Sequence, residues 1–133
     1  MATLEQRNHA RSFLKKAEEY LASAQDNLDL QRFTPAAGDA IHAGISAKDA
    51  IVVSLTGSTA KGKDHSTAPK ELGRALGQRP GAEGVVRALR ELVAAKADVE
   101  YGTDLVTQAK AAILVRRART VVEVAVQIVR LGR

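Results

Sequence analysis

One stretch rich in small residues decides the fold: Ala36-Ala37-Gly38-Asp39-Ala40-Ile41-His42-Ala43-Gly44-Ile45-Ser46-Ala47-Lys48-Asp49-Ala50-Ile51. Small side chains let helices approach one another closely, which favours a tight helical bundle over a sandwich of sheets. Thr34 is a good N-cap residue, Pro35 suits the first turn, and Gly57 suits the residue after a helix. The stretch therefore predicts a helix that Thr34 caps and that ends near Gly57.

Four further helices are expected besides this one. Residues 4–30 carry alanine and leucine at alternating steps of four and three, which places one apolar stripe on a helix, and Thr3 and Gln6 have the spacing of a capping box. A short helix is expected over residues 67–76, a long one over 82–99, and a last one over 108–131 with Thr107 as its cap. The last is rich in β-branched residues, but its apolar positions keep helical spacing. The fold class is all-α, an antiparallel up-down bundle of four main helices plus one short helix, in a single domain over residues 1–133.

Composition excludes several kinds of protein. With 133 residues the chain can bury a core, and because it has no cysteine it can form neither a disulfide nor a cysteine-ligated zinc site. No apolar run is long enough to cross a membrane, and the N-terminus lacks the pattern of a signal peptide. Aromatic residues are scarce, which weighs against a stacking platform for single-stranded nucleic acid. We expect a soluble, cytoplasmic protein with no cofactor and no membrane partner.

The positive charge is concentrated at the C-terminus. Residues 1–107 carry 14 basic and 14 acidic side chains, so the net charge of +5 belongs to residues 108–133. Arg116, Arg117 and Arg119 are therefore candidates for electrostatic contact with phosphates. The alternative is that these arginines form a solvated face, or pair with acids of the first and fourth helices.

The polar segment 57–64 resembles a phosphate-binding loop without completing one. Asp64 stands where the motif needs a serine or threonine hydroxyl for magnesium. The segment and the short helix after it still supply four candidate ligand-binding residues: Lys61, Lys63, His65 and Arg74. The alternative role for His65 is to donate to a backbone carbonyl and fix the turn. The spacing of the three histidines predicts no metal site, and His42 is expected to be a packing or rim residue.

Several of these elements together resemble the HEPN family. They are the Ala40/Ala43/Ala47–Lys48–Ala50 run, the loop that leads to His65, the segment Ala97-Asp98-x-x-Tyr101, and the block that begins at Thr107. The resemblance covers roughly residues 5–131. It implies a bundle of four main helices plus a short one, commonly dimeric. It also implies an association with nucleotide binding, RNA cleavage and toxin–antitoxin or defence systems, often beside a nucleotidyltransferase.

The ribonuclease members of that family share an Arg-x(4–6)-His motif, which this chain lacks. The windows that would hold the arginine are residues 2–4 before His9, 35–37 before His42, and 58–60 before His65, and none contains one. The resemblance therefore predicts no catalytic residue and a non-catalytic, homodimeric binding or regulatory module. Its partner would be a nucleotide, an RNA, or a cognate protein such as a nucleotidyltransferase. Two alternatives stay open: a divergent ribonuclease that uses His65 with Arg74 or the C-terminal arginines, and a purely structural or antitoxin-like module.

Overall fold

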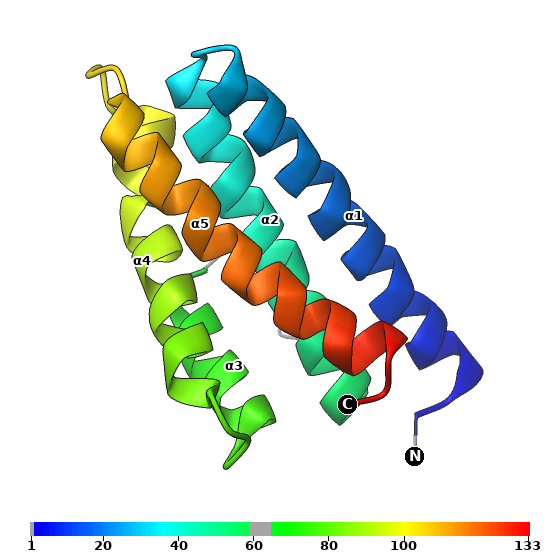
Figure 1. The fold of residues 1–133 in the computed structure, drawn as a ribbon. Coiled ribbons are helices and arrows are strands. Elements are labelled where there is room, and N and C mark those ends of the chain that lie inside the picture. Colours follow the sequence, from blue (N-terminus) through cyan, green and yellow to red (C-terminus); the bar gives the residue numbers. More distant parts are fainter. Residues whose placement is uncertain (1, 59–64) are drawn as a thin grey trace.

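The computed structural model describes residues 2–58 and 65–133, and in this part of the chain helices joined by short loops are the regular structure, with no strand (Figure 1). The main helices run up and down in turn, as the sequence predicts. Their bounds are α1 (Leu4–Asp29), α2 (Phe33–Thr56), α3 (Ala68–Leu76), α4 (Ala82–Tyr101) and α5 (Gln108–Ala125). A 3₁₀ turn, η1 (His65–Thr67), precedes α3, and one π-helical turn, η2 (Val126–Arg130), continues α5. The predicted all-α bundle is confirmed.

Helix α2 is the centre of the bundle, because it packs against α1, α3, α4 and α5. Its small residues make this possible: Ala40, Ala43 and Ala47 are fully buried. A Cβ atom built on Gly44 would lie 2.5 Å from Cδ1 of Leu92, so α2 and α4 cross at a point where only hydrogen fits. Among the described residues, no helix is both long and apolar enough to span a bilayer.

The helix ends confirm three predictions and correct one. Thr3 and Gln6 form the predicted capping box, Gly57 ends α2 with a φ of 89°, and the Thr107 hydroxyl accepts a hydrogen bond from the Lys110 N–H. Thr34, however, does not cap α2, because the helix already begins at Phe33. The Thr34 hydroxyl accepts instead from the backbone N–H of Val106 at 3.2 Å, and so ties the α4–α5 loop to α2. The hydroxyl that was predicted to cap the N-terminus of α2 therefore makes a tertiary hydrogen bond instead.

Candidate functional site

Of the four predicted ligand-binding residues, only His65 and Arg74 lie in the described part of the chain. Lys61 and Lys63 lie outside the described residues. His65 begins η1 and is partly exposed, whereas Arg74 lies on the exposed face of α3. No hydrogen bond or ion pair joins His65 to Arg74, so the described part of the chain does not assemble these two into one site.

The arginines of α5 do not form a bare stripe. Arg117 makes an ion pair with Glu91 of α4, and Nη2 of Arg119 donates to Oε1 of Gln25 in α1 at 2.7 Å. Arg116 is exposed and has no ion pair with any described residue. Further along, the guanidinium of Arg130 donates twice to the Glu18 carboxylate, at 2.7 and 3.1 Å. Pairing with acids of the first and fourth helices is therefore confirmed for Arg117 and Arg130, and phosphate contact at the predicted arginines stays a prediction.

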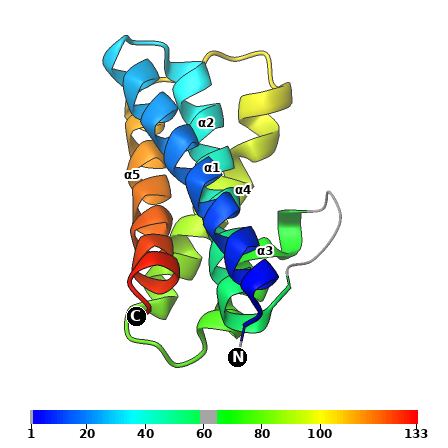
Figure 2. The same cartoon turned by 90° about the vertical axis from the view of Figure 1, so that its right-hand side faces the viewer.

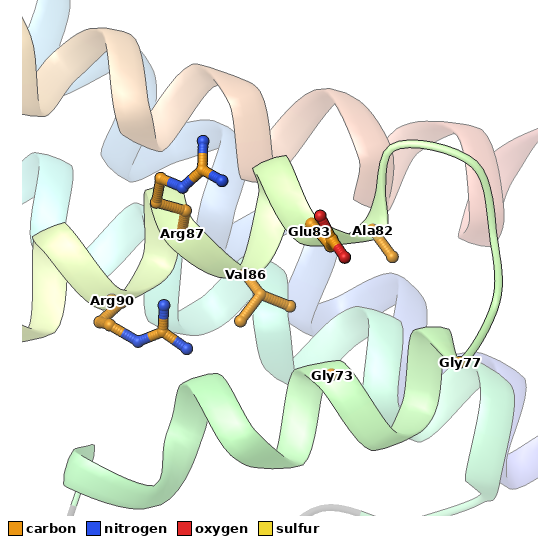
Figure 3. Close-up of a pocket in the computed structure, with 7 residues that line it drawn as sticks. All are labelled: Gly73, Gly77, Ala82, Glu83, Val86, Arg87 and Arg90. Carbon is orange, nitrogen blue, oxygen red and sulfur yellow. The ribbon is translucent and has the colours of Figure 1, made fainter.

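A groove lies at the surface between α3 and α4. This groove of about 340 Å³ is lined by Gly73 and Gly77 of the α3 side and, on α4, by Ala82, Glu83, Val86, Arg87 and Arg90 (Figure 3). Figure 3 shows Val86 and Arg90 projecting toward α3, while Arg87 extends away from it. Arg87, Arg90 and Glu83 are exposed, and none of them makes a hydrogen bond or ion pair with a described residue. We call this the α3–α4 groove.

The charge around the α3–α4 groove is predominantly positive. Residues 68–90 carry five basic side chains and only two acidic ones. The basic residues are Lys70, Arg74, Arg79, Arg87 and Arg90. One of the acids, Glu71, turns inward to the buried Lys48, with its Oε1 2.7 Å from the Lys48 Nζ. The sequence analysis missed this patch because it summed charge over residues 1–107, where acids elsewhere cancel it. The three-residue spacing of Arg87 and Arg90 on the polar face of one helix was the signal that could have revealed it.

A second polar cluster joins α1, α2 and α4. The His42 ring stacks on Tyr20 with centroids 5.2 Å apart, and its Nε2 lies 3.3 Å from Oε1 of Glu100. The other oxygen of Glu100 accepts from Lys96 at 2.8 Å, and this hydrogen bond raises the pKa of the Lys96 ammonium. Both carboxylate oxygens of Glu100 are thus engaged, one by His42 of α2 and the other by Lys96 of the same helix. His42 is a rim residue held by its neighbours, as predicted.

The described residues offer no metal centre. They contain no group of three or more histidine, aspartate, glutamate or cysteine side chains arranged to hold an ion. What the described surface does offer is an open basic groove and a polar cluster whose members already satisfy one another.

Comparison with known families identifies the bundle. The model of the HEPN domain family matches residues 10–129, which is most of the chain. This chain belongs to the HEPN family. No individual curated protein matches it at a significant level.

The HEPN match spans all five α-helices, and so includes the α3–α4 groove and the cluster around His42. Within this HEPN bundle the three histidines lie on three separate elements: His9 on α1, His42 on α2 and His65 on η1. None of them follows an arginine at the spacing that the sequence analysis tested.

Proposed function

We propose that this HEPN protein is a non-catalytic, dimeric binding module whose ligand is a nucleotide, an RNA or a cognate protein. One observation carries the proposal: no histidine of the chain has an arginine five to seven residues before it. Cleavage of RNA without a metal ion needs groups that move a proton and stabilise charge on phosphate, placed together. His42, the histidine best fixed in position, is held instead by Tyr20 and Glu100.

Exposed apolar side chains support the dimeric part of the proposal. Leu30, Tyr101 and Leu105 are 60%, 77% and 86% exposed. They belong to the end of the bundle where the α1–α2 turn and the α4–α5 loop meet (Figures 1 and 2). Large apolar residues gathered at one end commonly mark a protein contact. We place the interface between two copies of the chain at this end.

The setting that goes with this proposal is a toxin–antitoxin or defence system in which the module acts beside a nucleotidyltransferase. The support is the family membership alone. Co-expression with a nucleotidyltransferase from a neighbouring gene should give a complex that stays together through affinity purification and gel filtration. Elution of the two proteins as separate species would remove this setting from the proposal and leave the binding module itself untouched.

The absence of catalysis is tested with single-stranded RNA and purified protein in the presence of a chelator. The RNA should remain intact over hours, and overexpression should not arrest growth. Cleavage that His65→Ala abolishes would overturn the proposal and establish the divergent ribonuclease in its place.

The dimer is tested by light scattering, which should report about twice the chain mass of 14.1 kDa. Leu105→Asp should shift the mass toward that of one chain, because it buries a charge in the proposed interface. Leu4→Asp is the matched control, since Leu4 is 64% exposed but lies near the opposite end, by the N-terminus (Figure 1). A wild-type protein that remains a monomer at high concentration would refute the dimer.

A further inference from the structure

The α3–α4 groove is bordered by unpaired cations on both of its helices. Lys70 and Arg74 are exposed and four residues apart, so they lie on one side of α3, next to Gly73. On α4, Arg90 projects toward α3 (Figure 3). None of these three cations has an ion pair with a described residue. Positive charge therefore flanks the groove without an acid of this chain to neutralise it.

The two helices bring their cations to the same end of the groove. A Cβ atom built on Gly73 would lie 3.7 Å from Cγ2 of Val86, so these two residues face each other. The helices run in opposite directions (Figure 3), so Lys70, one turn before Gly73, is level with Arg90, one turn after Val86. Glu83 lies at the other end, beside the loop that joins the helices. The groove is thus cationic at one end and carries a carboxylate at the other.

Two glycines at this surface are not required by the bundle itself. Neither Gly73 in α3 nor Gly84 in the first turn of α4 has a positive φ. A Cβ on Gly84 would meet nothing within 4 Å, whereas one on Gly44 would lie 2.5 Å from Leu92. Glycine inside a helix costs about 0.5–1 kcal/mol relative to alanine. Gly73 lines the groove and Gly84 an adjoining hollow of about 400 Å³, so both leave bare backbone that another chain can approach closely.

The shape of the groove suits a helix. Two helices that lie side by side leave a furrow into which the side chains of a third helix can pack. From Glu83 to Arg90 α4 rises about 10 Å, which is about two turns. Between these charged residues the groove is lined by Val86 and by the backbone of Gly73. A helix that lies there would bury small apolar side chains against this centre.

The lining favours a protein segment over a nucleic acid. Of the described residues that line the groove, none is aromatic, so no ring is available on which a base could stack. The Glu83 carboxylate would repel a phosphate backbone that runs along the groove. The apolar centre at Val86 has no use in phosphate contact. An acidic helix, in contrast, can place its carboxylates at the cationic end and its apolar side chains at the centre.

We propose that the α3–α4 groove docks an acidic amphipathic helix of a partner protein. Small apolar side chains of that helix pack against Val86 and the backbone at Gly73, and its carboxylates pair with Arg90 and Lys70. Near Glu83 the docked helix carries neutral or basic residues, because this carboxylate repels acids. The inference rests on the proposed function, since it specifies the chemistry of the cognate protein and the surface that receives it.

The binding experiment uses the full chain and a labelled peptide of about 15 residues, long enough to form a helix when bound. The peptide carries alanine and leucine along one face and glutamate on the flanking positions. A scrambled peptide of the same composition and a single-stranded RNA are the comparison probes, and fluorescence anisotropy measures all three at the same salt concentration. The amphipathic peptide should bind at least about tenfold more tightly than the scrambled one.

A charge variant locates the cationic end. Arg90→Glu should weaken binding of the amphipathic peptide at least about tenfold, because it replaces an attraction with a repulsion. A peptide with lysine in place of glutamate should bind this variant better than it binds the wild type. The matched control is Arg11→Glu, which reverses an exposed arginine on α1, a helix that does not line the groove. This control should bind the acidic peptide about as well as wild type.

A shape variant separates the groove from a diffuse basic surface. Gly73→Leu changes no charge, has room for its Cβ, and fills the groove with the rest of its side chain. It should weaken binding at least about tenfold, while circular dichroism shows an intact helical protein. Gly73→Ala, a smaller change, should weaken binding less and yet make the protein more stable. Opposite changes in affinity and stability are expected only if the glycine serves the partner.

Four outcomes would overturn the inference. They are an amphipathic peptide that binds no better than the scrambled one, a folded Gly73→Leu variant that binds as well as wild type, an Arg11→Glu control that loses as much affinity as Arg90→Glu, and an RNA that binds more tightly than the peptide in a manner that depends on Arg90. None of these decides whether the protein cleaves RNA or forms a dimer, which the experiments of the proposed function test separately.

Discussion

The ammonium group of Lys48 lies 2.7 Å from Oε1 of Glu71, and this contact joins the centre of the bundle to α3. Only 4% of Lys48 is exposed, and Asp49 Oδ1 lies 2.5 Å from the same nitrogen. Burial of a lysine is costly unless carboxylates compensate its charge. By drawing Glu71 inward, the contact also removes a negative charge from the outer side of α3. The helix that forms one wall of the groove therefore presents mainly Lys70 and Arg74 to solvent.

Neutralising Glu71 should destabilise the fold. Glu71→Gln keeps the shape of the side chain but weakens one charged partner of Lys48, and we expect a loss of about 1–2 kcal/mol in the free energy of unfolding. Urea denaturation measures this loss. Lys70→Gln removes an exposed charge from the neighbouring position and should change the same quantity by less than about 0.5 kcal/mol. Equal effects of the two substitutions would show that the buried contact contributes nothing.

Two glycines on α2 and α3 should respond to alanine in opposite directions. Gly73→Ala should stabilise the protein by about 0.5–1 kcal/mol, because its Cβ meets Val86 at an ordinary 3.7 Å and glycine is a poor helix former. Gly44→Ala should destabilise it by about 1–3 kcal/mol, because its Cβ would lie 2.5 Å from the buried Leu92. Thermal unfolding of the two variants provides the comparison. A stabilised Gly44→Ala variant would mean that α2 and α4 do not cross so closely.

Removal of the ion pair between Glu91 and Arg117 should create a basic stripe on α5 that the wild-type bundle lacks. Glu91→Gln removes the acid that pairs with Arg117, so this arginine joins Arg116 as an exposed cation on α5. Weak, sequence-independent binding of RNA should rise at low salt, and the slope of log affinity against log salt should steepen by about one unit. Fluorescence anisotropy over a salt series measures both. In the wild-type background, replacing Arg116 and Arg119 by glutamine should change affinity little.

The contact between Lys96 and Glu100 should stabilise the fold at neutral pH and lose this effect at strongly alkaline pH. The hydrogen bond to Glu100 raises the pKa of Lys96 above its ordinary 10.5. Burial lowers this pKa to a smaller extent, and the charges of Glu100 and Tyr101 raise it further. Because the pKa of Lys96 is higher in the folded state, the contact contributes fully to the free energy of unfolding below pH 10.5. This contribution is lost as the pH rises through the pKa of Lys96 in the folded protein. Lys96→Met should therefore cost about 0.3–0.5 kcal/mol across neutral pH, a difference that shrinks toward zero above pH 10.5. Denaturation of both proteins at several pH values tests this; a difference that grows with pH would contradict it.

The helices were predictable because each is specified locally. The Thr3–Gln6 capping box and the Thr107 cap lie within a few residues of the backbone groups that they satisfy, so spacing alone identifies them. Thr34 was assigned wrongly for the complementary reason. Its hydroxyl serves the Val106 N–H, 72 residues away in sequence, and no local pattern reveals such a partner.

Sequence alone was enough to predict the all-helical class, the close approach of other helices to the small-residue helix, and the absence of an arginine at the tested spacing before each histidine. These are properties of periodicity, side-chain size and spacing along the chain. Which charges face solvent, by contrast, depends on how the helices pack. Packing brought Glu91 to Arg117, Glu18 to Arg130 and Glu71 to Lys48, and it left Arg87 and Arg90 beside two glycines. Ion pairing depends on distances of a few ångströms between residues far apart in sequence. A sum of charge along the chain therefore pointed to α5, where Arg117 proves to be paired, and overlooked Arg87 and Arg90, which have no ion pair with any described residue.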